Sequence, residues 1–341
     1  MKPVQRLWVH GALLGVAVLG ALYMWTRDPN APTDTADVRV WDGKPADVQK
    51  IVIDSKTKLS VLESKSDETG RWFEGSVKNK PAPSAKEPPA RADSHEEPSA
   101  KDSGKEPAED QRPIPLLSVK PAQRIVDAVA PLKAVREVGI VEGDPAGDFG
   151  LAIPDATISF TIGGVVRSLA VGTEAPGGTD RYVRVVETNM IYAVHGDFLR
   201  DLMAGEHALT ERDAHGFEDE DVKSVRILAG DKSRDVKRFG VAGWADSATP
   251  DASDDTIGTW MNKIARLRPT EFLTSPPTGT ELVLRLEYVG EKGPIGFLEL
   301  QRGTIDDKPV YYLRTEHTRK HAKAMQSVAE QIIEELEGLL K

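Results

Sequence analysis

The first pattern along the chain is an uncharged, largely apolar run of 20 residues, Leu7–Thr26. At about 1.5 Å per residue, a helix of this length spans about 30 Å, the thickness of a bilayer core. Positive charge from Lys2, Arg6 and the amino terminus precedes the run, which predicts that this end stays in the cytoplasm. We therefore expect an uncleaved helix that crosses the lipid bilayer over residues 7–26, a cytoplasmic tail over 1–6 and a linker over 27–37.

A cleaved signal peptide is the alternative interpretation of this run. It requires an apolar stretch of about 7–15 residues followed by small residues at the cleavage site. Val18-Leu19-Gly20 matches such a site poorly, and the run continues to Trp25. With either interpretation the remaining chain is exported, and we expect a single-pass protein of the bacterial cytoplasmic (inner) membrane with its bulk in the periplasm. The chain has no cysteine, so the exported part folds without disulfides.

Residues 78–115 interrupt the pattern of buried and exposed positions. They contain eight prolines, seven lysines or arginines, eight acidic residues and no aromatic residue. Such a segment cannot bury enough apolar surface to offset the entropy lost on ordering, so we predict a disordered insertion. It is either a tether or docking segment, or a surface loop without a role of its own.

The rest of the chain reads as one unit used twice, first over residues 38–204. Alternating apolar positions predict strands at 46–53 and 58–63, followed by the aromatic pair Trp72-Phe73. A helix is expected over Pro121–Glu137, and Pro131 should kink or split it. Further strands are expected at 157–162, 165–171, 181–186 and 190–194, and a short helix at 197–203.

The second unit covers residues 205–316 and repeats this order. It has predicted strands at 220–227 and 235–239, the aromatic residue Trp244 and a helix over 255–267. Strands at 281–288, 295–302 and 310–315 follow. Hairpin-length loops between strands imply antiparallel sheets. The predicted fold class is therefore a single N-terminal transmembrane helix followed by two duplicated α+β domains of antiparallel strands with packed helices.

A C-terminal amphipathic helix is predicted within residues 317–341, because apolar residues recur there at helical spacing. Its charges oppose the helix dipole, with Arg319, Lys320 and Lys323 near the start and three glutamates near the end. The helix either packs on the second domain or is compensated by a partner.

Net charge limits the classes of partner. The chain carries −10, and residues 1–27 contribute +3, so the exported part carries −13. Nucleic-acid phosphates require a basic face, so we expect no nucleic-acid partner. Broad adhesion of the exported part to anionic lipid headgroups is disfavoured for the same reason.

Candidate chemistry is sparse. His317 and His321 have the four-residue spacing of zinc ligands on a helix, but Thr318 stands where the metalloprotease pattern requires glutamate, and no third ligand is evident. Asp148-Phe149-Gly150 resembles a kinase triplet without any other kinase motif. Residues 172–180 are rich in glycine but lack the lysine of a phosphate-binding loop, so we interpret them as a turn.

Two other polar groups complete the candidates. Asp251, Asp254 and Asp255 do not have the spacing of a calcium loop, and Asp255 is better explained as a helix cap or first-turn acid. Four residues near hairpin ends are interpreted as scattered polar positions: His195 and Asp197, and Glu206 and His207. We therefore predict no catalytic, cofactor-binding or metal-binding residues and no enzymatic activity.

Residues 121–203 resemble a bacterial family of envelope proteins that is catalogued only as a domain of unknown function. Residues 211–227 resemble that family's junction into a second tandem copy. Members of the family carry one N-terminal membrane helix and often accompany components of gliding-motility-type ABC transporters. The resemblance thus implies two tandem copies and integral membrane partners such as transporter subunits. It rests on these segments: Phe149-Gly150-Leu151, Pro154, 156–162, 169–172, Tyr182-Val183-Arg184-Val185, Ile191-Tyr192-Ala193-Val194, 198–202, Glu211-Arg212-Asp213 and 217–227.

These patterns predict a non-enzymatic, membrane-anchored periplasmic accessory or scaffold protein that works with an ABC-type transporter or another envelope complex. The alternative is an extracytoplasmic module that binds a ligand or a glycan. Such a module should present a concave site lined by aromatic residues. The chain has only six tryptophans and six tyrosines, and three of these twelve lie in the apolar run.

Overall fold

The computed structural model describes residues 37–81, 112–141 and 147–341. The chain divides into two compact units, Met1–Val38 and Arg39–Lys341, and every described helix belongs to the second. The predicted anchor at 7–26 and most of the predicted insertion at 78–115 lie outside the described residues. The cellular location inferred from the anchor therefore stays a prediction.

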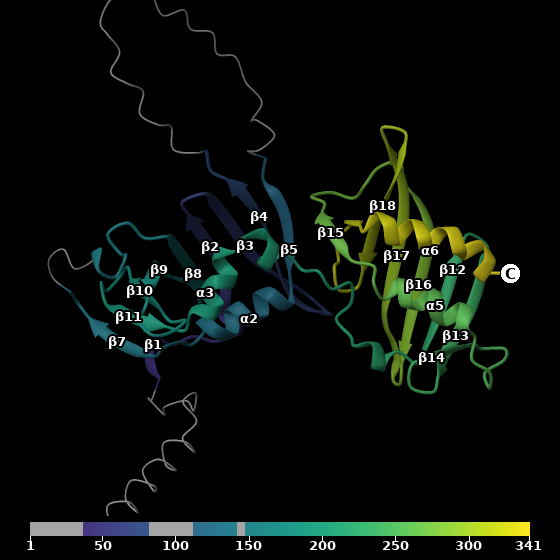
Figure 1. The fold of residues 1–341 in the computed structure, drawn as a ribbon, viewed down its shortest axis with the longest axis horizontal. Coiled ribbons are helices and arrows are strands. Elements are labelled where there is room, and N and C mark those ends of the chain that lie inside the picture. The colour runs from purple at the N-terminus through teal and green to yellow at the C-terminus, as the bar shows by residue number, and fades with distance from the viewer. Residues whose placement is uncertain (1–36, 82–111, 142–146) are drawn as a thin grey trace, which may run out of the picture. The chain divides into compact units, whose positions relative to one another are not determined.

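The first large sheet contains nine strands, and neighbouring strands pair antiparallel throughout (Figure 1). Strand β8 shows why it forms, because buried and partly exposed residues alternate along all seven of its positions. The hydrogen-bonded order of the sheet is β5 (Ile114–Ser118), β4 (Gly70–Asn79), β3 (Lys58–Asp67), β2 (Val48–Ser55), β8 (Ala156–Ile162), β9 (Val165–Glu174), β10 (Arg181–Val185), β11 (Ile191–Val194), β7 (Arg136–Gly139).

The second large sheet contains eight strands, again with antiparallel pairings. A separate two-stranded sheet joins β1 (Val38–Trp41) and β6 (Leu132–Ala134). The order of the second large sheet is β14 (Gly243–Asp246), β13 (Lys232–Phe239), β12 (Ser224–Ala229), β16 (Glu281–Gly290), β17 (Gly293–Ile305), β18 (Lys308–Thr315), β19 (Ala322–Ala324), β15 (Pro269–Phe272).

The two large sheets share one strand order. In the first sheet β2, β3 and β4 are neighbours in that order, and β8 to β11 continue the sheet from the other side of β2. In the second sheet β12, β13 and β14 are neighbours in the same way, and β16 to β19 continue from the other side of β12. Strands β7 and β15, which come after helices α2 and α5 along the chain, lie at the far edges of their sheets, and in the first half the short strand β6 precedes β7. Strand β5 is the one addition in the first sheet, where it covers the outer side of β4.

The predicted fold class, a transmembrane helix followed by α+β domains, is wrong. Strands account for 47% of the described residues and helices for 20%, in three sheets, so the protein is mostly β. Among the described residues, no helix is long and apolar enough to cross a membrane. The prediction of antiparallel sheets is confirmed by the pairings.

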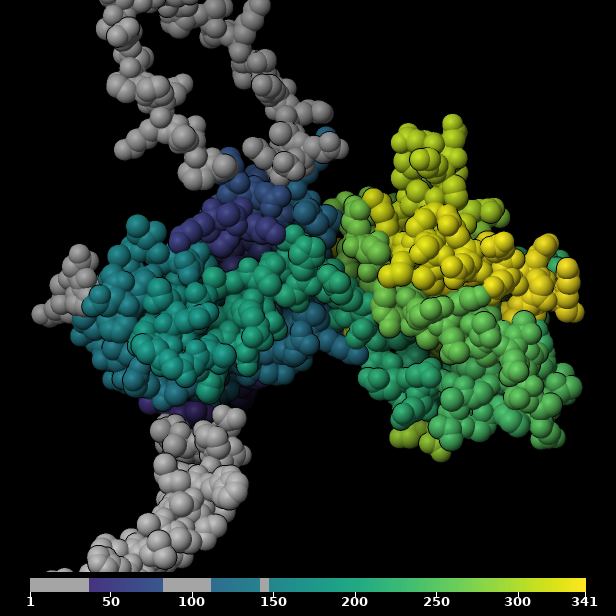
Figure 2. Space-filling model, in the orientation of Figure 1, coloured from purple at the N-terminus to yellow at the C-terminus, as the bar shows by residue number. Residues whose placement is uncertain are grey.

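Helices cover one face of each large sheet. Helices α5 (Asp255–Ile264) and α6 (Gln326–Leu339) lie side by side over the second sheet, where Trp260 Nε1 donates to the Ile332 carbonyl at 3.1 Å (Figures 1 and 2). Their apolar faces and the inner face of the sheet form one buried cluster that includes Trp260, Leu286 and Leu298. Helices α2 (Lys120–Val129), α3 (Gly196–Met203) and α4 (Glu206–Leu209) lie together beside the first sheet.

Two predicted helices are shorter than expected. The helix predicted over 121–137 ends at Val129, and Pro131 separates it from the short strands β6 and β7. The C-terminal helix predicted within 317–341 covers only Gln326–Leu339, because residues 322–324 pair as β19. Helix α5 begins as expected, although its cap is Asp254, whose carboxylate accepts from two backbone N–H groups, and Asp255 is the first-turn acid.

Candidate functional site

Two segments far apart in the sequence cross at the junction between the two large sheets. One is Glu211–Phe217, which follows α4, and the other is Thr315–Thr318, which follows β18. Thr315 Oγ1 donates to the Ala214 carbonyl at 2.5 Å and also accepts from the backbone N–H of Thr318. These bonds hold the two segments against each other, and each segment contributes one histidine and one glutamate to the other.

Glu211 and His317 form the inner of these two pairs. Both side chains are buried, and His317 Nε2 lies 3.4 Å from Glu211 Oε2. The Glu211 carboxylate also accepts from the backbone N–H groups of Lys120, Arg212 and Asp213 at 2.9–3.0 Å. Burial alone would raise the pKa of Glu211, but the close approach of His317 and the backbone hydrogen bonds lower it to about 2. The carboxylate is therefore ionised, and it holds its own segment and the start of α2 while it lies against His317 of the other segment.

His215 and Glu316 form the outer pair. His215 Nδ1 and Glu316 Oε1 share a hydrogen bond of 3.0 Å. Glu316 also accepts from the backbone N–H of Phe297 at 2.9 Å. The imidazole stacks on Phe217 at 4.6 Å between ring centroids and meets Tyr288 edge-on at 4.7 Å. Gly296 lies against this group, and only a glycine leaves room for it.

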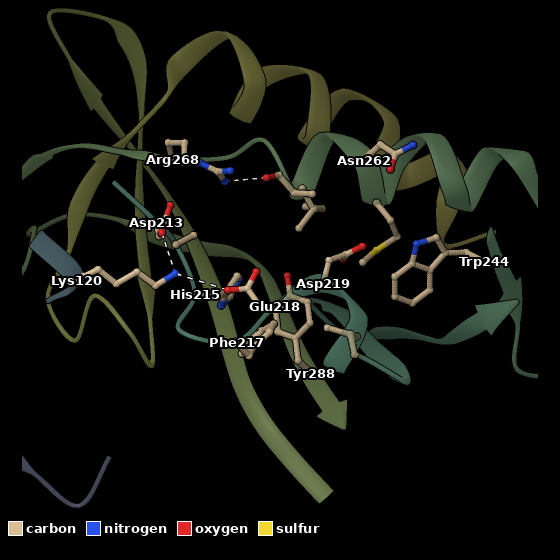
Figure 3. Close-up of a pocket in the computed structure, with 15 residues that line it drawn as sticks. Lys120, Asp213, His215, Phe217, Glu218, Asp219, Trp244, Asn262, Arg268 and Tyr288 are labelled. Atoms are coloured by element: carbon tan, nitrogen blue, oxygen red, sulfur yellow. Dashed lines mark hydrogen bonds and ion pairs between the residues drawn. The ribbon is translucent and has the colours of Figure 1, made fainter. Parts of the chain in front are cut away.

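A cavity of about 240 Å³ lies beside this junction, between the segment 213–219 and helix α5 (Figure 3). Its walls are aromatic and apolar, from Phe217, Trp244, Met261, Ile264 and Tyr288. Its polar lining is mainly charged: Lys120, Asp213, Glu218, Asp219 and Arg268.

The charges of this cavity come from several elements. Lys120, at the start of α2, places its ammonium 2.9 Å from Asp213 Oδ2 and 4.0 Å from Glu218 Oε1 (Figure 3). The hydrogen bond to Asp213 and the nearby negative charges raise the pKa of Lys120. Burial, and then the negative charge of Glu316 and Asp219, raise the pKa of Tyr288. Both shifts have the sign that a negative potential produces.

A larger cavity lies on the other side of the ring group. Its lining includes Arg285, Glu287, Phe297 and Arg319, and it shares Phe217 and Tyr288 with the first cavity. Phe297 has the guanidinium groups of Arg285 and Arg314 at 5.2 and 5.4 Å from its ring centroid. Glu299 is buried between the same two arginines, so the charges of this face are paired with each other.

Further contacts join the two sheets next to the crossing segments. Leu117, Phe272 and Ala322 form a buried apolar cluster, and Trp72 packs against it. Arg319 lies over the Trp72 ring at 4.4 Å and binds Asp67 at 3.0 Å, while Lys320 binds Glu74 at 2.6 Å. The junction thus combines apolar contact with charges contributed by both sheets.

The comparison with protein families applies to the same region. Residues 120–286 match a domain of unknown function, DUF4340. The DUF4340 domain begins at the lysine of the first cavity and ends within β16, so it contains the segment 211–217 but not Glu316 or His317. The resemblance to a family of unknown function is confirmed over these residues. No curated protein and no solved structure matches the chain.

The structure separates the candidate zinc pair. His317 and His321 both precede α6, and His321 Nε2 lies 3.2 Å from Gln301 Nε2 rather than beside His317. The two histidines therefore do not share a helical face. Among the described residues, no group of three histidine, cysteine or acidic side chains is arranged to hold a metal ion.

The other candidate residues make packing contacts, turns or ion pairs with their neighbours. Phe149 of the kinase-like triplet packs edge-on against Tyr182 at 4.8 Å. Residues 172–180 contain the end of β9 and the turn into β10, as the turn interpretation predicted. The scattered polar residues near hairpin ends pair with neighbours: His195 with Asp180, Asp197 with Arg200, and Glu206 with Lys58 and His207.

Sequence reasoning missed the crossing of the two segments. A weak signal exists, since adjacent side chains in an extended segment point to opposite sides. Glu316 and His317 could therefore serve two different partners, and residues 211 and 215 supply the complementary charges. Their partners lie about 100 positions away along the chain, and no local pattern pairs positions at that separation.

Proposed function

We propose that this protein is a non-enzymatic accessory or scaffold subunit of an envelope membrane complex, with an ABC-type transporter as the candidate partner. One observation carries the proposal. The side chains at the junction that are best suited to acid–base chemistry instead join the two sheets: Glu211, His215, Glu316 and His317. Residues 39–341 form one compact unit as a result, which suits a part that holds other subunits in place.

We further propose that the two sheet halves arose as tandem copies of one domain. Their shared strand order supports this, because β2, β3 and β4 correspond to β12, β13 and β14 in both sequence and sheet position. Strands β8 to β11 correspond in the same way to β16 to β19. A duplicated module offers two related surfaces on one chain, as a scaffold that contacts more than one subunit needs.

The test is crosslinking in cells that express a carboxy-terminally tagged full-length chain, followed by detergent extraction, affinity purification and mass spectrometry. Stoichiometric recovery of a transporter permease or ATPase is the expected result. Recovery of the well-expressed chain alone would contradict the scaffold role. Fractionation of the same cells tests the predicted periplasmic side of the inner membrane.

Ligand binding is the second candidate function, because the cavity beside α5 has the aromatic lining expected of a binding module. Phe217, Trp244 and Tyr288 all contribute to it. The crosslinking experiment does not test this candidate, since a small ligand is not recovered as a protein partner.

A further inference from the structure

The cavity between the segment 213–219 and α5 has a size that limits its ligand. Its volume of about 240 Å³ is below the range of about 300–1,000 Å³ found for pockets that hold drug-sized molecules. A nucleotide or an oligosaccharide would therefore not fit within it. One compact group, or one long side chain, is the appropriate occupant.

The charge around the cavity determines the sign of that occupant. Acids approach it from two sides: Asp213, Glu218 and Asp219 line it, and Glu316 stands behind His215. Among the described residues, two cations line it: Lys120 is bonded to Asp213, and Arg268 is bonded only to the carbonyls of Ala265 and Leu267. Arg238, outside the lining, pairs with Asp219. Acids thus outnumber cations in the lining, and Glu218, which is 80% exposed and 4.0 Å from the Lys120 ammonium, is the acid most open to a further cation.

Tyr288 supplies a polar contact inside the cavity. The residue is 4% exposed and lines the cavity, and its phenolic oxygen makes no hydrogen bond to another described residue. The oxygen is not among the fully enclosed polar atoms that lack a partner, so it reaches the space of the cavity. Its oxygen has lone pairs free to accept a hydrogen bond. Aromatic faces attract cations, and the Arg238 guanidinium already lies over the Trp244 ring, 4.3 Å from its centroid.

Lys120 shows that the entrance of the cavity can hold an alkylammonium group. Its alkyl chain reaches from α2 and places an ammonium between Asp213 and Glu218 (Figure 3). This contact is partly exposed, with side-chain exposures of 44% for Lys120 and 80% for Glu218, so it can be exchanged for another ammonium.

We propose that this cavity binds a protonated alkylamine, with its alkyl part on Met261 and the aromatic walls and its ammonium at Tyr288, Asp219 and Glu218. The amine comes either as a free small molecule or as a lysine side chain of a partner polypeptide. The inference deepens the ligand-binding candidate and does not depend on the scaffold role, so each can fail alone.

The test is a titration of the full-length protein with n-butylamine at pH 7 and low ionic strength, followed by the NMR signal of the Trp244 indole N–H. The variant Trp244→Phe assigns that signal. We expect n-butylamine to bind at least tenfold more tightly than the neutral isostere 1-butanol, and high salt to weaken its binding. Equal affinity for the two molecules would overturn the proposal.

Three variants sharpen the test. Lys120→Ala should strengthen butylamine binding several-fold, because it removes the ammonium that now occupies Asp213 and Glu218. Asp219→Asn should weaken binding several-fold, while Arg238 keeps its bond to the backbone carbonyl of residue 219 at 2.8 Å. Asp235→Asn is the matched control, since it also removes an arginine partner but lies away from the cavity. Unchanged affinity in Lys120→Ala would contradict the proposal.

A second ligand distinguishes the two sources of the amine. Nα-acetyl-lysine methylamide carries a peptide backbone on each side of the same alkylammonium. Binding as tight as that of n-butylamine supports a partner lysine, and much weaker binding supports a free amine.

Discussion

Adjacent side chains at the end of β18 bind two different partners because the extended backbone directs them to opposite sides. Glu316 meets His215, and His317 meets Glu211. Each segment thus provides one glutamate and one histidine, so two pairs join the segments rather than one isolated ion pair. Removing one member leaves a buried charge without its partner, which is costlier than removing both.

Glu211 gives the junction a defined dependence on pH. Its pKa of about 2 in the folded protein is below the unfolded value of 4.5, so its stabilisation is complete above about pH 4.5 and is lost as the pH falls towards 2. The loss amounts to no more than about 3.5 kcal/mol at about 1.4 kcal/mol per pKa unit. Glu211→Gln should be destabilised at pH 7, and its difference from wild type should shrink as the pH falls.

Urea unfolding at pH 7, 4 and 3 measures this difference. Glu218→Gln is the control, because Glu218 is exposed and the variant should follow the wild type at each pH. A gap between wild type and Glu211→Gln that stays constant down to pH 3 would show that the carboxylate is not the titrating group.

Gly296 is required by the crowding around the outer pair. A Cβ atom there would lie 2.5 Å from the Glu316 carboxyl carbon and 2.7 Å from Phe217 Cε1. Glu316 is fixed by His215 and by the backbone of Phe297, so it cannot move aside without losing those bonds. We expect Gly296→Ala to lower the free energy of unfolding by about 1–3 kcal/mol.

Gly258→Ala is the matched control for that substitution. Gly258 lies within α5 with no atom near its missing side chain, so alanine should stabilise the helix by up to about 1 kcal/mol. Thermal unfolding of both variants should shift in opposite directions. Equal shifts would mean that the Gly296 contact is not the cause.

At the scale of elements, Asp254 determines where α5 begins. Its Oδ1 atom accepts from the backbone N–H groups of Thr256 and Ile257 at 2.9 and 3.1 Å. Asp254→Ala should cost about 0.5–2 kcal/mol of stability, measured by denaturant unfolding. Asp251→Ala, in the exposed loop before the helix, should change it little, and an equal loss in both would contradict the cap assignment.

The strands with full alternating patterns were predictable from the sequence. β8 and β18 lie within one or two residues of their predicted ranges, because several periods of alternation distinguish a strand from a helix. The strands β7, β15 and β19 have only three or four residues and escaped prediction, since so short a segment shows no complete period. Those missed strands, and the helices shortened beside them, moved the fold from α+β to mostly β.

The candidate site was less predictable than the fold. The residues of the first cavity come from α2, the segment 213–219, β14, β16 and α5, and tertiary packing alone brings them together. Trp244 was noted only as an aromatic residue after a strand, and Lys120 and Tyr288 stood out by no local pattern. The paired histidines attracted attention through their spacing, but the chain does not form a helix there.

At the scale of the whole molecule, the apolar cluster at the junction should make residues 39–341 unfold together. Phe272 is 1% exposed and packs with Leu117 and Ala322 between the two sheets. Phe272→Ala should cost about 3–5 kcal/mol and separate a single calorimetric transition into two. Phe239→Ala, at a position that is 37% exposed and outside the junction, is the control, and one undivided transition in Phe272→Ala would contradict the role of the cluster.

Phe217 and Tyr288 form a shared wall between the two cavities. A wall of two rings cannot move towards one space without enlarging the other. Any occupant that shifts it must therefore change the affinity of the opposite side, and thermodynamic reciprocity requires the converse by the same factor. The junction between the two sheets would therefore couple binding in one cavity to binding in the other, although the two occupants make no contact.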